Sequence, residues 1–265
     1  MHRAGAGVFE QAPTLKRTKR MNAMDNVIVT EGLTKRYKDK TAVDGISITV
    51  PEGQLVALLG VNGAGKTTTI RMLSCLTQPT AGKAFVYGRD VEKESEAVKR
   101  LVGISTQDTA VAENLTVREN LEFMAGIYLE KGKVKTAVDE AIKAFSLSEY
   151  ENKKAKTLSG GWKRKLSIAM AIIGEPKVLF LDEPTLGLDV LARRQLWREI
   201  EALKDRMSIV LTTHYMEEAE ALADRIFVMI NGVIAAEGTL AELEAATGKK
   251  GLEEVFVSIA EGEGV

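Results

Sequence analysis

Residues 55–69 read Leu-Val-Ala-Leu-Leu-Gly-Val-Asn-Gly-Ala-Gly-Lys-Thr-Thr-Thr, and this stretch decides the fold of the chain. Its first five residues are an uninterrupted apolar run, which predicts a strand buried on both faces. Gly60–Thr67 then match G-x-x-x-x-G-K-[ST], the P-loop or Walker A pattern. Apolar side chains at helical spacing follow as far as Leu76. A strand, a glycine loop and a helix in this order predict a phosphate-binding loop rather than a chance match.

The residue types of this loop suit a nucleoside triphosphate. Glycines permit a close backbone approach that a Cβ atom would block, and their amides with the helix N-terminus form a cradle for phosphate oxygens. We expect the Lys66 ammonium to reach the β- and γ-phosphates and the Thr67 hydroxyl to bind Mg²⁺. The expected nucleotide ligands here are Gly60, Asn62, Gly63, Ala64, Gly65, Lys66, Thr67 and Thr68.

Length and composition indicate one large domain, or one core with inserted lobes. The 265 residues are 45% hydrophobic, which is sufficient for a sizeable core. No apolar run approaches the roughly 20 residues of a membrane-spanning helix. The single cysteine, Cys75, excludes an intrachain disulfide and suits a reducing cytoplasm. The net charge of −1 gives no footprint of nucleic-acid binding, so no nucleic-acid partner is expected.

Residues 1–23 differ in composition from the rest. They are rich in Lys and Arg, and Glu10 is their one acidic residue. They contain no apolar segment of the kind found in a secretory signal. We interpret them as a disordered tail, or as a segment upstream of a true start at Met24. A basic arm that touches anionic lipid is the alternative.

Strands and helices are expected to alternate along the chain, as in an α/β fold with a parallel sheet. Apolar runs predict strands near 27–31, 46–50, 55–59, 84–87, 102–106, 178–182, 208–212, 226–230 and 233–236. Asn231-Gly232 is the signal of a type I′ turn between the last two. Helical spacing and capping patterns predict helices near 67–76, 92–100, 117–129, 134–145, 162–173, 190–203, 216–223 and 239–246. The helices within about 108–175 are expected to form a lobe inserted in the core.

Polar residues follow several predicted strands directly. They are the P-loop, Gln107, Asp182-Glu183 and His214. Because the carboxyl ends of parallel strands share one edge of a sheet, these residues are expected to form one phosphate site. Asp182 ends a buried strand, where a carboxylate is costly unless a cation pairs with it, so it fits a Mg²⁺ ligand. Glu183 can then polarise the water that attacks the γ-phosphate. An acid pair that caps a helix before Pro184 is the alternative.

The order of these motifs resembles that of the nucleotide-binding subunits of ABC transporters. Leu158-Ser-Gly-Gly161 is similar to the signature sequence that separates this family from other P-loop ATPases. Residues 213–224 and 252–256 resemble exporters of the drug-resistance (ABC-2) subgroup. The similarity extends from about Val27 to the C-terminus, through Tyr37, Gly60–Thr67, Gln107, Leu158–Gly161, Asp182-Glu183, Leu188-Asp189 and His214.

The resemblance implies a fold and an assembly. The fold is a P-loop NTPase core with a mainly parallel sheet, an N-terminal antiparallel β subdomain and an inserted α-helical subdomain, all within residues 24–265. The assembly is a head-to-tail dimer that holds ATP and Mg²⁺ between one P-loop and the signature of the other subunit. Ser159, Gly160 and Gly161 would bind the γ-phosphate in trans, and Asp189 would cross the dimer interface.

The resemblance also implies roles within one subunit. Tyr37 would stack on adenine, with a core tyrosine as the alternative. Gln107 would bind Mg²⁺ and the attacking water, with a polar loop residue as the alternative. His214 would contact the γ-phosphate and orient Glu183. The implied catalytic residues are therefore Glu183, His214, Gln107 and Lys66, and the implied metal ligands are Thr67, Gln107 and Asp182.

Three positions depart from the pattern of the family. Val61 replaces a common proline in the P-loop. Ser105 and Thr106 precede Gln107, where an apolar residue and proline are frequent. Trp162 follows the signature glycines in place of glutamine or methionine, and either packs against the helical lobe or the other subunit or is tolerated at the surface.

The expected function is ATP hydrolysis that drives export of a small, drug-like or lipidic molecule. The chain would act with itself or a homologous ATPase subunit and with a separate membrane permease, peripherally on the cytoplasmic face of the cell membrane. The alternative is a soluble ABC ATPase without a transport role, acting in cluster assembly or on DNA or ribosomes. A P-loop kinase is a third interpretation, but it leaves Ser159–Gly161 unexplained.

Overall fold

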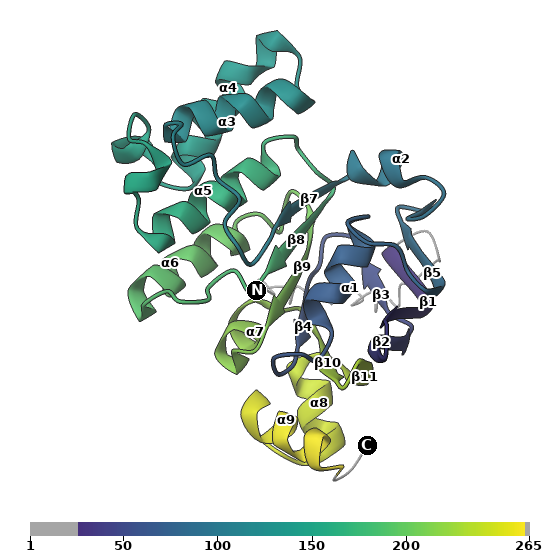
Figure 1. Ribbon diagram of the computed structural model, residues 1–265. Helices are drawn as coiled ribbons and strands as arrows, with labels where there is room; N and C mark the ends of the chain where they lie inside the picture. The colour runs from purple at the N-terminus through teal and green to yellow at the C-terminus, as the bar shows by residue number, and fades with distance from the viewer. Residues whose placement is uncertain (1–25, 263–265) are drawn as a thin grey trace, which may run out of the picture.

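The computed structural model describes residues 26–262, which form two β-sheets with helices between and around them (Figure 1). The segment 1–23, predicted to be a tail, lies outside the described residues. Within residues 26–262, none of the helices combines the length and the hydropathy that crossing a membrane requires.

The central sheet has the strand order β11-β10-β4-β9-β8-β7, and its neighbouring strands are parallel except for the pair β10 and β11. Its strands are β4 (Leu55–Leu59), β7 (Val102–Ser105), β8 (Val178–Asp182), β9 (Ser208–Thr213), β10 (Arg225–Ile230) and β11 (Val233–Gly238). β4, β8 and β9 are buried along their whole length because helices cover both faces. Asn231 and Gly232 have φ values of 49° and 87°, which is the positive-φ pair of the predicted type I′ hairpin. The predicted α/β core is confirmed.

The second sheet is antiparallel, as expected for the N-terminal part of the chain. It contains β1 (Asn26–Tyr37), β2 (Lys40–Ile46), β3 (Thr49–Pro51), β5 (Ala81–Val86) and β6 (Arg89–Asp90). β1 is much longer than the strand expected at 27–31, and β2 was not predicted at all. Both segments expose many charged side chains at irregular intervals, since the β1–β2 pairing contains register shifts. Their sequences therefore lack the alternation that identifies a half-buried strand.

Helix α1 (Lys66–Leu73) lies between the two sheets and joins them into one body (Figure 1). Ile70, Met72 and Leu73 are fully buried in a cluster that also contains strand residues of both sheets. The helix ends before the predicted Leu76, because the chain reverses direction at Cys75, where φ is 59°.

The other face of the central sheet is covered by α5 (Gly160–Ile172), α6 (Val190–Glu201), α7 (Met216–Leu222), α8 (Leu240–Thr247) and α9 (Leu252–Glu261). α2 (Ser95–Lys99) is shorter than expected, since Asp90 accepts hydrogen bonds from the amides of Glu92 and Lys93 and holds them in a turn.

Between β7 and β8 the chain forms α3 (Val117–Tyr128) and α4 (Lys131–Ala144), two short 3-10 turns (Ser148–Tyr150 and Ala155–Thr157), and α5. The predicted capping box begins α3: the amide of Glu119 donates to the Thr116 hydroxyl, and the amide of Thr116 donates to the Glu119 carboxylate. Figure 1 shows α3 and α4 stacked beyond α5, away from the central sheet. The expected α-helical subdomain is therefore present in the fold.

Candidate nucleotide-binding site

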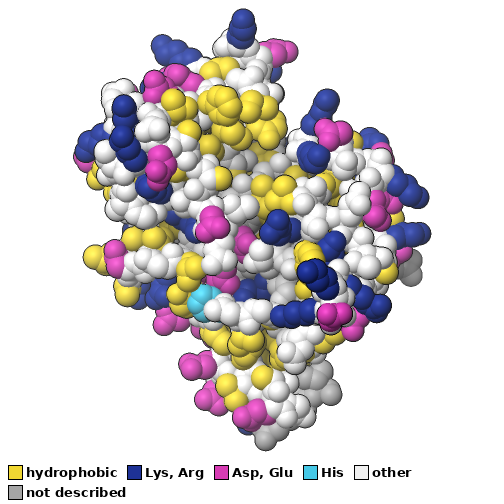
Figure 2. Space-filling model, viewed as in Figure 1, with side chains coloured by type: hydrophobic (Ala, Val, Ile, Leu, Met, Phe, Trp, Pro, Cys, Tyr) yellow, Lys and Arg dark blue, Asp and Glu magenta, His cyan; other side chains and the backbone are white. Residues whose placement is uncertain are grey.

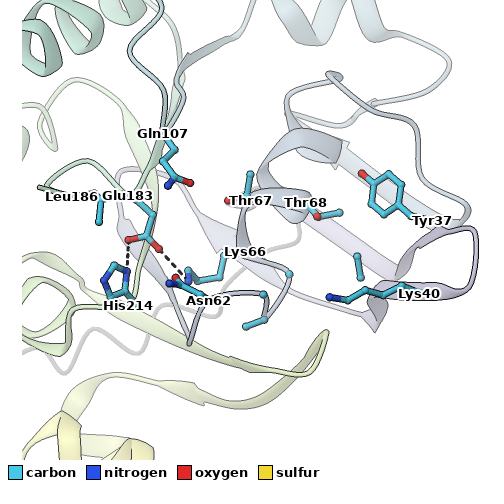
Figure 3. Close-up of a pocket in the computed structure, with 14 residues that line it drawn as sticks. Tyr37, Lys40, Asn62, Lys66, Thr67, Thr68, Gln107, Glu183, Leu186 and His214 are labelled. Carbon is cyan, nitrogen blue, oxygen red and sulfur yellow. Dashed lines mark hydrogen bonds and ion pairs between the residues drawn. The ribbon is translucent and has the colours of Figure 1, made fainter.

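A cavity of about 480 Å³ opens at the carboxyl ends of the central strands, in front of the N-terminus of α1 (Figure 3). It contains most of the residues that the sequence predicted to form a phosphate site. Gly60 and Asp182 do not line the cavity but contact residues that do. The lining residues are Tyr37, Lys40, Ala42, Asn62, Gly63, Ala64, Gly65, Lys66, Thr67, Thr68, Gln107, Glu183, Leu186 and His214.

Two glycines of the P-loop are required by close packing. A Cβ atom on Gly60 would lie 2.3 Å from the carbonyl oxygen of Met229. A Cβ atom on Gly65 would lie 2.4 Å from the carbonyl oxygen of Ala42, and Gly65 also has φ of 108° as the N-cap of α1. At both positions the nearest atom is a backbone oxygen, so only a residue without a Cβ atom allows the loop to approach the neighbouring chain this closely.

A buried carboxylate links the P-loop to the end of β9. Glu183 accepts from the Lys66 ammonium at 3.1 Å through Oε1 and contacts His214 Nδ1 at 2.8 Å through Oε2. Lys66 also donates to the carbonyl oxygens of Gly60 at 2.7 Å and Val61 at 3.2 Å. Figure 3 shows Lys66 and His214 on either side of the Glu183 carboxylate. A strand-terminal acid is thus held between a cation and an imidazole, beside a phosphate-binding loop.

The backbone of Glu183 adopts a conformation that non-glycine residues seldom use, with φ of 47°. Hydrogen bonds hold it there, because the Glu183 amide donates both to the carbonyl oxygen of Thr212 and to its hydroxyl. Non-glycine residues held at positive φ are concentrated at functional sites. This conformation directs the carboxylate into the cavity rather than toward α6, and it argues against the alternative of a helix-capping acid pair.

Oxygen donors gather where the sequence predicted a metal. The Thr67 hydroxyl donates to Asp182 Oδ1 at 2.9 Å, and the Thr212 hydroxyl donates to the same oxygen at 2.6 Å. In residues 26–262, no group of three or more His, Cys, Asp and Glu side chains could hold a metal alone. One carboxylate and one hydroxyl beside a phosphate cradle fit Mg²⁺, which is held by few protein ligands and by substrate phosphates.

The signature residues line a second cavity, and no residue lines both. This cavity, about 680 Å³, lies between the N-termini of α5 and α6 and contains Ser159, Gly160, Gly161 and Asp189. Ser159 is the N-cap of α5, yet its side chain makes no capping hydrogen bond. Asp189 has a structural role, since its carboxylate accepts from the amides of Leu191 and Ala192 at the start of α6. Within one chain the signature therefore does not reach the P-loop cavity.

Tyr37 lies at the opposite end of the P-loop cavity from Glu183 and His214 (Figure 3). Its side chain is 45% exposed, so the alternative of a core tyrosine is wrong. Lys40 and Thr212 belong to the site but were not predicted. Lys40 starts the unpredicted strand β2, and the position of Thr212 at the end of a predicted strand was the signal available for it.

A fully buried carboxyl group lies on α7, four residues after His214 in the sequence. Glu218 of α7 accepts from Trp197 Nε1 of α6 at 3.1 Å, and burial raises the pKa of its carboxyl group. Trp197 thereby joins the helix that follows Asp189 to the helix that follows His214.

The comparisons with known proteins agree with this geometry. The ABC transporter family profile matches residues 43–186, more than half of the chain. The chain belongs to the ABC transporter family. It binds nucleotide and is an ATPase of this family.

Two relatives from Streptomyces species and one solved structure show what this ABC ATPase is similar to. It is 44% identical over 223 residues to "Daunorubicin/doxorubicin resistance ATP-binding protein DrrA" of Streptomyces peucetius, covering 83% of this chain and 68% of the relative. It is 43% identical over 226 residues to "Daunorubicin resistance ATP-binding protein DrrA3" of Streptomyces coeruleorubidus, covering 84% and 72%. An ATP-binding subunit of an ABC transporter superimposes with a TM-score of 0.80 at 28% identity, covering 88% of this chain and 99% of that one.

Proposed function

We propose that this ABC ATPase powers export of a small, drug-like or lipidic molecule through a separate membrane permease. The observation that carries the proposal is the Glu183 carboxylate, which is held between Lys66 and His214 at the mouth of the P-loop. The relatives named above are resistance ATP-binding proteins, and they favour transport over a soluble ATPase without a transport role.

Hydrolysis follows from the positions of these side chains. Lys66 would exchange its contacts with the loop carbonyls for the β- and γ-phosphate oxygens of ATP. Water attacks the γ-phosphorus while its proton passes to Glu183, and the bond to the β-phosphate oxygen breaks to leave ADP. His214, bonded to the second carboxylate oxygen, would keep Glu183 turned toward that water.

Mg²⁺ would be held by Thr67, Asp182 and Gln107, together with phosphate oxygens. The adjacent hydroxyl and carboxylate of Thr67 and Asp182 support this assignment, and Gln107 faces the same cavity. When bound, the ion neutralises charge on the phosphates.

Tyr37 is proposed to stack on the adenine ring. Tyr37→Ala should weaken ATP binding by about 1–3 kcal/mol, or roughly 5- to 150-fold, because stacking on the base is lost. Tyr37→Phe should bind ATP like the wild type, since the ring is kept. Titration with a fluorescent ATP analogue measures both constants. Equal affinity of the Ala and Phe variants for the ATP analogue would show that the Tyr37 ring does not stack on adenine.

The second half of each ATP site is proposed to come from another subunit. The Ser159 hydroxyl and the amides that open α5 are suited to bind a γ-phosphate, because a helix N-terminus attracts anions. They face the second cavity rather than the P-loop cavity of their own chain. A head-to-tail dimer with itself or a homologous subunit would place the signature of one copy over the nucleotide of the other.

The permease is proposed to dock on α3, which would hold the chain at the cytoplasmic face of the membrane. Phe123 and Ile127, one turn apart on this helix, are 62% and 59% exposed. Figure 2 shows hydrophobic side chains gathered in this part of the molecule, beside a hollow. Met124 and Tyr128 of the same helix line a small cavity together with residues of β7 and α5. An apolar patch of this kind is typical of a protein interface.

The double substitution Phe123→Ser and Ile127→Ser tests this role. In the source cell, the variant should move from the membrane fraction to the supernatant, because its contact with the permease is lost. The ATPase activity of the purified variant should stay within twofold of the wild type, since both side chains are largely exposed and lie outside the nucleotide site. Val257→Ser, which removes an exposed apolar side chain from α9, is the control and should remain with the membranes. A double variant that sediments like the wild type would contradict docking on α3.

A further inference from the structure

Arg164 of α5 is buried, with 5% of its surface exposed, although it carries a full charge. No carboxylate in residues 26–262 lies within ion-pair distance of its guanidinium. Its partners are two backbone carbonyl oxygens: Nη1 donates to Thr106 at 2.6 Å and Nη2 donates to Gln107 at 2.5 Å. Burial lowers the pKa of this arginine, while the more distant Asp182 and Asp108 act in the opposite direction. Charge-assisted bonds to the segment before the nucleotide site thus replace the usual ion pair.

A second contact joins the same two segments one turn further along α5. The hydroxyl groups of Ser167 and Ser105 lie 2.9 Å apart in the interior. The three consecutive residues 105, 106 and 107 are therefore each bonded to α5. This pairing also gives a physical reason for Ser105, which departs from the apolar residue common in the family.

The backbone of Gln107 is fixed by Arg164, but its side chain is free to act. Figure 3 shows the Gln107 side chain directed toward Glu183 and Thr67. Ser159 is the N-cap of the helix that carries Arg164, so the residue whose guanidinium holds Gln107 lies five positions after the cap of α5. A rigid helix therefore has the signature at its start and the support of Gln107 just over one turn later.

We propose that Arg164 is a positioning residue that sets Gln107 in the nucleotide site and couples it to the signature through α5. The proposal rests on the function proposed above, in which Gln107 serves the nucleotide of its own subunit and Ser159–Gly161 serve that of the partner. If α5 shifts when its signature contacts the partner's nucleotide, Gln107 would then move toward or away from the nucleotide of its own subunit. Arg164 makes this link with a planar fork that reaches two carbonyl oxygens at once, which a lysine cannot do with the same geometry.

The test measures ATPase activity of the full chain against Mg²⁺ concentration at fixed ATP. Arg164→Met should raise the Mg²⁺ concentration for half-maximal activity, and lower kcat, by about 10- to 100-fold, as expected for loss of a group that orients a metal ligand. Binding of a fluorescent ATP analogue without Mg²⁺ should be unchanged. Arg164→Lys should give an intermediate Mg²⁺ requirement. The control Lys163→Met removes the neighbouring cation of α5, which pairs with Glu113 at the surface, and should behave like the wild type.

A role limited to holding α5 on the sheet predicts a different pattern. Stability would fall, but the folded fraction would keep the wild-type Mg²⁺ requirement, and this result would overturn the proposal. If Arg164→Met does not fold, Arg164→Lys decides: a raised Mg²⁺ requirement supports the link, and a wild-type requirement overturns it.

A double-mutant cycle with Gln107→Ala separates action through Gln107 from an independent effect. If Arg164 acts through Gln107, adding Arg164→Met to Gln107→Ala causes little further loss, whereas additive losses contradict the link. Glu183→Gln tells the two proposals apart. If that variant retains turnover, the proposed function fails; if it loses turnover while Arg164→Met responds to Mg²⁺ like the wild type, only the coupling fails.

Discussion

Glu183→Gln is expected to reduce ATP hydrolysis by at least about 100-fold, because the amide cannot accept the proton of the attacking water. ATP binding should persist, since Lys66 and the P-loop amides are unchanged. The Lys66 ammonium would also no longer be paired with a carboxylate. Phosphate release under saturating ATP measures the first effect, and equilibrium binding of a fluorescent ATP analogue measures the second. A loss confined to kcat would identify Glu183 as a group that acts on the reacting atoms.

Glu217→Gln is the matched control for this substitution. Glu217 also lies near His214 in sequence, but it is an exposed residue that pairs with Arg193 at the surface. Loss of such a pair has little effect on stability, and ATPase activity should stay within twofold of the wild type. Turnover of Glu183→Gln close to that of Glu217→Gln would reject Glu183 as the base.

Gly160→Asp is expected to lower ATPase activity by roughly 100-fold without weakening the fold. Its added carboxylate would face the γ-phosphate of the partner's nucleotide, and juxtaposed like charges cost several kcal/mol. Stability should not fall, because apart from its chain neighbours and the backbone of its own helix no atom lies within 4 Å of a Cβ at this position. An acid in the first turn of α5 also interacts favourably with the helix dipole, by about 0.3–1 kcal/mol. ATPase assays and thermal unfolding measure the two effects separately.

The neutral isostere Gly160→Asn controls for size at this position. It should retain much more activity than Gly160→Asp, because the shape is the same and the charge is absent. ATP affinity of the Asp variant should match the wild type at low protein concentration, since Gly160 lines the second cavity and not the P-loop cavity. Equal activity of Asp and Asn variants would show that no phosphate approaches Gly160.

The parts of the site that the sequence predicts are those encoded by short contiguous patterns. The P-loop is one such pattern, and an apolar run followed by Asp182-Glu183 is another. Both identify a strand end and the polar group that it presents. Tyr37 and Asp189 were named from motif order, and the structure adds what that order could not contain: the exposure of the tyrosine and the capping bonds of the aspartate.

Contacts between segments that are distant along the chain could not be predicted from the sequence. Arg164 donates hydrogen bonds to Thr106 and Gln107, which precede it by 58 and 57 positions. A helix rich in lysine and arginine gives no indication of which of its cations is buried. Strand β2 was missed for a related reason. Charged side chains interrupt its alternation of polar and apolar residues, whereas its backbone pairing with β1 stabilises the strand. Because Lys40 starts that strand, its place in the nucleotide site was not predicted either.

Sedimentation of Glu183→Gln with and without Mg²⁺ and ATP tests the central claim most directly, namely that each ATP is enclosed by the P-loop of one copy and the signature of another. The variant should be a dimer with Mg²⁺ and ATP and a monomer without nucleotide, because bound ATP is not hydrolysed and continues to bridge the two copies. Adding Gly160→Asp should return it to a monomer while ATP stays bound. A Glu183→Gln chain that remains monomeric with ATP, or a dimer that persists despite Gly160→Asp, would contradict the account.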